Sequence, residues 1–240
     1  MNKLMKSITL IGKKVLSTVL LSLCVTTGFG QHIFNVDPVQ AAEIAAFMKQ
    51  PSAVEGKCNA EVLGIVTTAS EFSWDDINTW KNADGKVWAD GATADYAPTV
   101  FGFGFKKNAP YNGGASWICL ITNKDDDKWN PAIPGVADLK GNFILSNCNA
   151  TTVKIANSQI NTIKICMNNP TEDCYISTKR NSNLEQLDIS GSTGKLRQIE
   201  AYKNKFRDET SLVADNLGEK VLIDWLFNIE NNLYTFSTLP

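Results

Sequence analysis

Short apolar pairs recur along the second half of the chain at a nearly fixed step. Each pair consists of two apolar residues separated by one. The pairs are Phe143 and Leu145, Val153 and Ile155, Ile163 and Ile165, Cys174 and Ile176, Leu187 and Ile189, Ile199 and Ala201, and Phe227 and Ile229. The step between second members is nearly constant from Leu145 to Ala201 and then lengthens before Ile229. Because side chains alternate sides along a β-strand, each pair predicts a short strand with one buried face.

A strand this short cannot bury its apolar face alone, so the repeat predicts strands that stack as a solenoid. Asparagines recur between the pairs, at Asn147, Asn157, Asn168 and Asn204. An Asn turned inward at a tight turn can bind backbone groups that the turn leaves unpaired. We therefore expect stacked turns joined by a ladder of amides. The alternative is an ordinary antiparallel sheet, against which the even spacing and the recurring Asn both count.

One unit fits a known repeat template closely. Residues 196–206 (LRQIEAYKNKF) match L-x-x-L-x-L-x-x-N-x-L with Ala and Phe at two positions, and residues 150–160 fit it with Ala at the first position and Ser158 at the Asn position. That pattern resembles the leucine-rich repeat. The predicted fold class is α+β: a short leucine-rich repeat solenoid of parallel β-rungs over 139–240, preceded by a helical and β-rich N-terminal cap over 31–138.

A second resemblance lies nearer the N-terminus. Residues 41–49 (AAEIAAFMK) have helical spacing of apolar side chains, and Pro51 ends the predicted helix. Residues 44–65 resemble the N-terminal module of secreted leucine-rich repeat proteins of Gram-negative anaerobes, with internalin-like or adhesin-type repeats. In that family the repeats are preceded by an apolar helix and then by the short sequence motifs QPSA, GK-x-N (a turn) and LG. Residues 231–240 resemble the close of a repeat unit in that family. The resemblance implies surface display and adhesion to proteins or host cells.

Residues 1–30 have the pattern of a secretory signal peptide. A lysine-rich start precedes the apolar run 15–25, which is too short to span a bilayer, and Gly30 precedes the expected cleavage at Gln31. We expect a secreted or outer-surface protein with no retained membrane span. The alternatives are a lipoprotein with the lipid on Cys24 and a retained membrane anchor.

Charge narrows the choice of partner. The chain has 23 basic and 25 acidic residues, and removal of the four signal lysines leaves 19 against 25, a net charge of −6. With no basic stripe, the sequence does not favour nucleic acid as a partner.

The segment 66–138 contains five of the six tryptophans, with Gly, Asp and Asn punctuating it. We interpret it as a β-rich subdomain or an elaborated cap. Most of these tryptophans are expected to be buried. Trp88, in the turn-rich loop 84–91, is the one we expect to be exposed and available to a sugar or a protein partner.

The sequence offers little for catalysis. The one histidine, His32, lies two residues after the expected cleavage point, which disfavours Ser-His and Cys-His chemistry. The oxygen-rich run 125–127 lacks the spacing of a calcium loop, and the adjacent Asp75 and Asp76 point apart rather than across a glycosidase cleft. We expect no metal site and no cofactor.

Five cysteines follow the expected cleavage point, with no C-x-x-C pair. They are expected to be buried thiols, as Cys148 and Cys166 are within repeat units. If a disulfide forms, a bridge between Cys166 and Cys174 is the one we expect. The last repeat has no closing helix before Pro240, which predicts either a longer natural chain or a partner chain that covers the edge.

The sequence therefore favours a protein that binds without catalysis, most simply a protein or host-surface ligand. The predicted binding face is a mixed-charge stripe of outward strand residues: Lys154, Lys164, Asp188 and Glu200. A solvated face without a partner is the alternative for all four. The rival functions are a carbohydrate-binding module centred on residues 74–129, a hydrolase that uses carboxylates, and an inert fragment of a larger adhesin.

Overall fold

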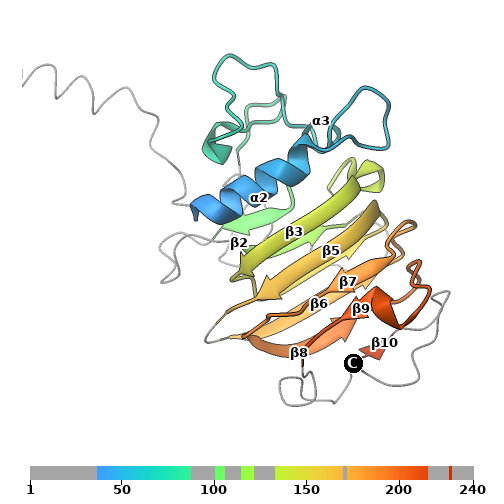
Figure 1. The fold of residues 1–240 in the computed structure, drawn as a ribbon. Coiled ribbons are helices and arrows are strands. Elements are labelled where there is room, and N and C mark those ends of the chain that lie inside the picture. Colours follow the sequence, from blue (N-terminus) through green and yellow to red (C-terminus); the bar gives the residue numbers. More distant parts are fainter. Residues whose placement is uncertain are drawn as a thin grey trace, which may run out of the picture. The chain divides into compact units, whose positions relative to one another are not determined.

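The computed structural model describes residues 37–87, 101–105, 115–121, 133–169, 172–215 and 227–228, all in one compact unit. Two β-sheets dominate it (Figure 1). The first has six strands in the order β1-β2-β4-β6-β8-β10, and the second has four in the order β3-β5-β7-β9. The six are β1 (Phe103–Phe105), β2 (Ala115–Leu120), β4 (Thr152–Ala156), β6 (Asp173–Lys179), β8 (Lys195–Glu200) and β10 (Phe227–Asn228). The four are β3 (Lys140–Cys148), β5 (Gln159–Met167), β7 (Gln186–Asp188) and β9 (Leu212–Val213).

The strand pairings from β2 onward are parallel, and β1 is antiparallel to β2. The chain crosses from one sheet to the other after each strand from β3 to β9, so consecutive strands in this range do not pair with each other. These strands form a parallel β-solenoid of about three turns. The prediction of stacked parallel rungs is confirmed, and the antiparallel alternative is wrong.

The register explains the spacing of the apolar pairs. In the six-stranded sheet Val153 aligns with Ile176 and then Ile199, and the two sequence intervals are equal. That interval is one whole turn of the solenoid. The shorter step between successive apolar pairs is half a turn, because each turn contributes one strand to each sheet. The first six apolar pairs, from Phe143 and Leu145 to Ile199 and Ala201, are buried in the core between the sheets. Ile229 of the seventh pair lies outside the described residues.

A ladder of buried polar side chains supports one corner of the solenoid. The Asn181 side chain accepts from the backbone N–H and hydroxyl of Ser158 at 3.1 and 2.8 Å, and its amide donates to the Ile155 carbonyl at 2.9 Å. Asn204 repeats this one turn later, accepting from the Asn181 N–H at 3.1 Å and donating to the Thr178 carbonyl at 2.7 Å. The predicted amide ladder is confirmed at Asn204.

The other predicted ladder residues have different places. Asn157 has a φ of 60°, and Arg180 and Lys203 at the same position of the next turns have a φ of 57°. Asn tolerates this left-handed turn conformation, so Asn157 shapes the corner while Ser158 faces inward. Asn147 and Asn168 form an exposed amide pair at the opposite corner, 3.0 Å apart.

Helix α2 (Pro38–Lys49) runs along the edge of β3 (Figure 1). The predicted helix 41–49 is confirmed, and it begins three residues earlier because the Asp37 side chain accepts from the backbone N–H groups of Val39 and Gln40. Its large buried apolar side chains are Ile44, Phe47 and Met48. Helix packing alone would leave the outer backbone groups of β3 unpaired.

Side chains of α2 and of the residues that follow it make hydrogen bonds to these backbone groups of β3. Asn59, which begins α3 (Asn59–Val62), donates to the Lys140 carbonyl at 2.8 Å and accepts from its N–H at 3.1 Å. Gln50 makes the same pair of bonds to the backbone of Asn142, both at 2.8 Å. Glu43 accepts from the Ser146 N–H. The edge of β3 is thus hydrogen-bonded by side chains, as another strand would bond it.

Turns and short 3₁₀ helices, η1 (Ile77–Thr79) and η2 (Val136–Asp138), make up most of the described part of 66–138. Trp80 is buried against Phe72 and Trp74, and β1 and β2 belong to the six-stranded sheet rather than to a separate subdomain. That sheet therefore extends upstream of the predicted boundary at residue 138. Trp88 lies outside the described residues, as do residues 1–36 and the ending 231–240.

The five cysteines of the described residues are unpaired thiols, Cys148 fully buried and Cys166 half-buried. The expectation of thiols is confirmed, and the alternative bridge between Cys166 and Cys174 is absent. Among the residues that the structure describes, no helix is long and apolar enough to cross a membrane.

Candidate functional site on the outer face of the six-stranded sheet

The four predicted stripe residues lie on two different sheets. Lys164 on β5 aligns with Asp188 on β7 in the four-stranded sheet. Lys154 on β4 and Glu200 on β8 lie in the six-stranded sheet. The prediction of one continuous mixed-charge stripe is therefore wrong. It assumed one strand per turn, whereas each turn has two strands whose outward faces point in different directions.

The outer face of the four-stranded sheet neutralises its own charges. The Lys164 ammonium lies 2.8 Å from the Asp188 carboxylate. Asp188 also accepts hydrogen bonds from the Ser190 N–H and hydroxyl, at 2.9 and 2.6 Å. Burial by itself would raise the pKa of Asp188, but the bonds from Lys164 and Ser190 outweigh it and lower that pKa. The hydrogen bond to Asp188 and the charge of its carboxylate raise the pKa of Lys164.

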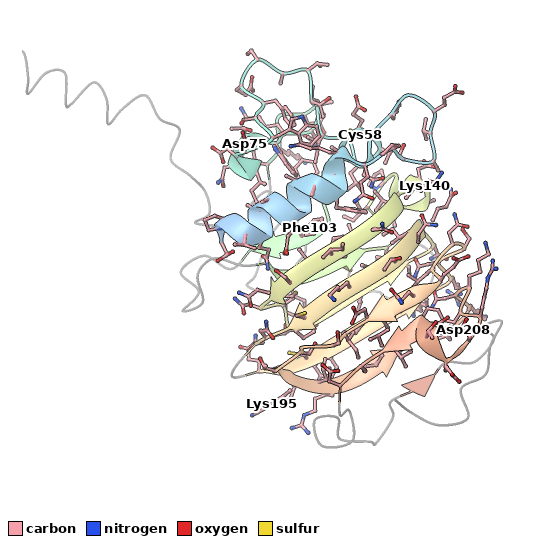
Figure 2. The ribbon with its side chains drawn as sticks, in the orientation of Figure 1. Cys58, Asp75, Phe103, Lys140, Lys195 and Asp208 are labelled. Atoms are coloured by element: carbon pink, nitrogen blue, oxygen red, sulfur yellow. The ribbon has the colours of Figure 1, made fainter. Side chains whose placement is uncertain are left out.

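Two rows of outward side chains cross the six-stranded sheet. The first row runs from β2 to β8 through Trp117, Thr152, Tyr175 and Gln198. The second runs beside it through Cys119, Lys154, Ser177 and Glu200. We call these eight residues the outer-face site. Figure 1 shows β6 and β8 in the sheet that presents it, and Lys195, labelled in Figure 2, begins β8.

Glu200 is held in a fixed orientation within the outer-face site. The Ser177 hydroxyl donates to one carboxylate oxygen at 3.0 Å, and the Gln198 amide donates to the other at 2.9 Å. Each oxygen keeps a second lone pair as an acceptor. A carboxylate fixed in this way accepts hydrogen bonds from a ligand without first losing the freedom of its side chain.

Lys154 carries a cation into a half-buried position. Burial lowers the pKa of Lys154 because water is withdrawn from the charged form, and the neighbouring Lys179 lowers it further. The charge of Glu200 acts in the opposite sense. Lys179 lies over the ring of Tyr202, 5.7 Å from its centroid. The folded chain therefore keeps the Lys154 ammonium in a position where burial disfavours its charged form.

Two aromatic side chains belong to the same face. Tyr175 is 41% exposed at the centre of the first row, and Trp117 is half-buried two strands away. Cys119 is buried, and burial raises the pKa of its thiol to about 12, so it is protonated and unreactive at neutral pH. The outer-face site thus offers aromatic surface, a cation and an oriented carboxylate, but no nucleophile with a lowered pKa.

The sequence pattern identifies Lys154 and Glu200 and misses their neighbours. Tyr175 lies between the members of an apolar pair but carries no charge, so a search for a charged stripe passes over it. Ser177 and Gln198 lie just outside the pairs. Aligning the chain at the interval of a whole turn would find them, since Thr152, Tyr175 and Gln198 then fall into one row.

The other residues considered for catalysis, metal binding or sugar binding are not part of the outer-face site. Asp76 accepts from the Asn78 N–H at the start of η1, and Asp75, labelled in Figure 2, lies beyond α2 away from the strands. Residues 125–127 and Trp88 are outside the described residues. Within the described ranges, no three His, Cys, Asp or Glu side chains lie close enough together to hold a metal ion.

Comparison of the chain with protein-family models, with curated proteins and with solved structures finds no match. The geometry of the chain itself must therefore support any functional conclusion.

Proposed function

We propose that this chain is a secreted or surface-displayed solenoid that acts by adhesion, binding a cell-surface ligand through the outer-face site without catalysis. One observation carries the proposal: a half-buried lysine and a carboxylate held by two hydrogen bonds lie on an outward face, where core packing does not require them. Desolvated and oriented polar groups cost stability, and binding sites commonly contain them.

Kinship to leucine-rich repeat adhesins is part of the proposal. In residues 196–206 the five template positions are all buried: Leu196, Ile199, Ala201, Asn204 and Phe206. The Asn position of the template corresponds to the ladder of Ser158, Asn181 and Asn204. This agreement supports the resemblance, although the second half of each turn here is a strand. The bonds from α2, Gln50 and Asn59 to β3 support the idea of an N-terminal cap on the solenoid.

The proposal is tested by binding of the fluorescently labelled full chain to cultured epithelial cells. We expect saturable binding that falls about fivefold or more in Lys154→Glu, since reversing a charge in an interface costs more than a kcal/mol. Lys140→Glu is the matched control, because Lys140 is exposed on β3 of the other sheet. Absence of saturable binding, or equal loss in both variants, would refute the proposal.

A carbohydrate ligand is the second candidate, and the aromatic row favours it. The rival interpretation of the sequence centred on Trp88, which is outside the described residues, but Trp117 of the same segment lies on the outer-face site with Tyr175. A protein ligand is what the leucine-rich repeat resemblance implies. The two candidates share one face and differ in the chemistry of the ligand.

A further inference from the structure

We propose that the ligand of the outer-face site is an oligosaccharide whose sugar rings stack on Tyr175 and Trp117. This inference rests on the proposed binding function and names the class of ligand. It depends on three observations: the spacing of the aromatic side chains, the polar groups beside them, and the absence of an exposed apolar patch on this face among the described residues.

The aromatic spacing suits an extended chain of rings. Trp117 and Tyr175 occupy the same row, on strands separated by β4. Neighbouring strands are about 4.8 Å apart, so the two aromatic side chains stand roughly 10 Å apart. Thr152 lies between them on β4, with a short polar side chain. One sugar ring cannot reach both aromatic side chains, whereas an oligosaccharide can lie along the row.

The exposure of Tyr175 fits a stacking role. Its neighbours in the row, Thr152 and Gln198, are half-buried and polar, so no apolar side chain on an adjacent strand of the row covers the ring. A tyrosine combines an apolar ring face, which packs against the C–H face of a sugar, with a hydroxyl that reaches water or ligand. Tyr175, 41% exposed at the centre of the sheet, therefore presents a ring on which a sugar can stack.

The polar groups beside the row match sugar hydroxyls. Each hydroxyl both donates and accepts, so its recognition needs donors and acceptors side by side. Glu200 supplies fixed acceptors and the Gln198 amide supplies a donor, both on β8, the strand next to that of Tyr175. Two bonds already orient the Glu200 carboxylate, which reduces the entropy lost on binding.

A protein ligand fits this face less well. The core of a protein interface is depleted in charge and rich in apolar contacts. Among the described residues the exposed large apolar side chains are Val39, Ile144 and Tyr175, and only Tyr175 belongs to the outer-face site. Two aromatic side chains among charged and polar groups suit a sugar, whose hydroxyls need polar partners, better than they suit the apolar core of a protein interface.

The test is a glycan array probed with the labelled full chain, followed by titration with the oligosaccharide that gives the strongest signal. Tyr175→Ala is expected to weaken binding about tenfold, the loss of one stacking contact. Tyr175→Phe keeps the ring and should retain most of the affinity. Ile144→Ala is the control, because Ile144 is equally exposed on the other sheet. All three substitutions are at exposed positions, so folding is preserved and is checked by circular dichroism.

Treatment of epithelial cells separates this inference from the proposed function. Periodate, which oxidises sugar diols, should abolish binding of the chain to cells, whereas protease should reduce it less. A silent array together with binding that is sensitive to protease and resistant to periodate would overturn the oligosaccharide and leave the adhesive function standing. Cell binding unaffected by both Tyr175→Ala and Lys154→Glu would overturn both.

Discussion

The two outer faces of the solenoid arise from the same alternation of residues, yet they treat charge differently. On the four-stranded sheet, Lys164 and Asp188 meet in an ion pair that satisfies both. On the six-stranded sheet, Lys154 is half-buried with a lowered pKa, and Glu200 is bound to neutral donors. The first face joins two opposite charges directly. The second face orients a carboxylate through neutral donors and holds a lysine in a half-buried position.

This difference shows that the alternation of apolar and polar residues along a strand identifies the outward side chains but not which of them are functional. Lys154 and Lys164 are both lysines at the centre of an apolar pair, in consecutive half-turns. Their roles diverge because their cross-strand neighbours differ: Asp188 for Lys164, and Cys119 and Ser177 for Lys154.

The largest expected effect comes from breaking the buried ladder of Ser158, Asn181 and Asn204, which supports the turns between the two sheets. Asn181→Ala should lower the free energy of unfolding by about 2–4 kcal/mol, because it leaves the N–H and hydroxyl of Ser158 and the Ile155 carbonyl without their buried partner. Chemical denaturation measures the loss. Asn168→Ala at the exposed corner is the control, and an equal loss there would contradict the importance of burial.

A second substitution in the shared core should have the opposite sign. Thr178 is fully buried, and among the described residues its hydroxyl has no hydrogen-bond partner. Thr178→Val keeps the shape and removes the unpaired group, so it should raise the free energy of unfolding by about 1 kcal/mol. A lower melting temperature in this variant would show that the hydroxyl is bonded in solution.

The two faces should respond differently to the loss of a charge. Lys154→Met should leave stability unchanged or raise it, since a lowered pKa means that folding disfavours the charged lysine. Asp188→Asn should lower stability by about 0.5–1 kcal/mol, because the folded state favours that carboxylate. Thermal melts of the two variants, compared with the parent, measure this contrast. Destabilisation by Lys154→Met beyond that of Asp188→Asn would remove the distinction between the faces.

The smallest effect is the pH dependence of the Asp188 contribution. Its pKa is lowered by folding, so its stabilisation is complete above the unfolded value of about 4 and is lost as pH falls through the folded value. The difference in stability between the parent and Asp188→Asn should therefore vanish at low pH. Urea denaturation from pH 7 to pH 2 follows it, and a difference that grows on acidification has the wrong sign.

The stacked strands of the solenoid could be predicted from the sequence because each is determined by a few residues that are adjacent in the chain. An apolar pair determines which side of a strand is buried, and a regular step implies stacking. The helix at 41–49 was predictable for the same reason, and its earlier start depends on Asp37, whose side chain caps the first turn.

The candidate site could not be predicted in full because it depends on register between distant strands. Tyr175 and Gln198 become neighbours only when β6 and β8 align across a whole turn, with a shift between Cys174 and Tyr175. The inward place of Ser158 also depends on the corner, where Asn157 takes the left-handed conformation. No single apolar pair contains that information.

The most direct test of the account is hydroxyl-radical footprinting of the chain with and without bound ligand. Tyr175 and Ile144 serve as paired reporters, because they are 41% and 43% exposed on the two different sheets. With the oligosaccharide from the array bound, we expect Tyr175 and Trp117 to lose reactivity while Ile144 keeps its own. Protection of Ile144 with Tyr175 unchanged would place the ligand on the four-stranded sheet and contradict the account.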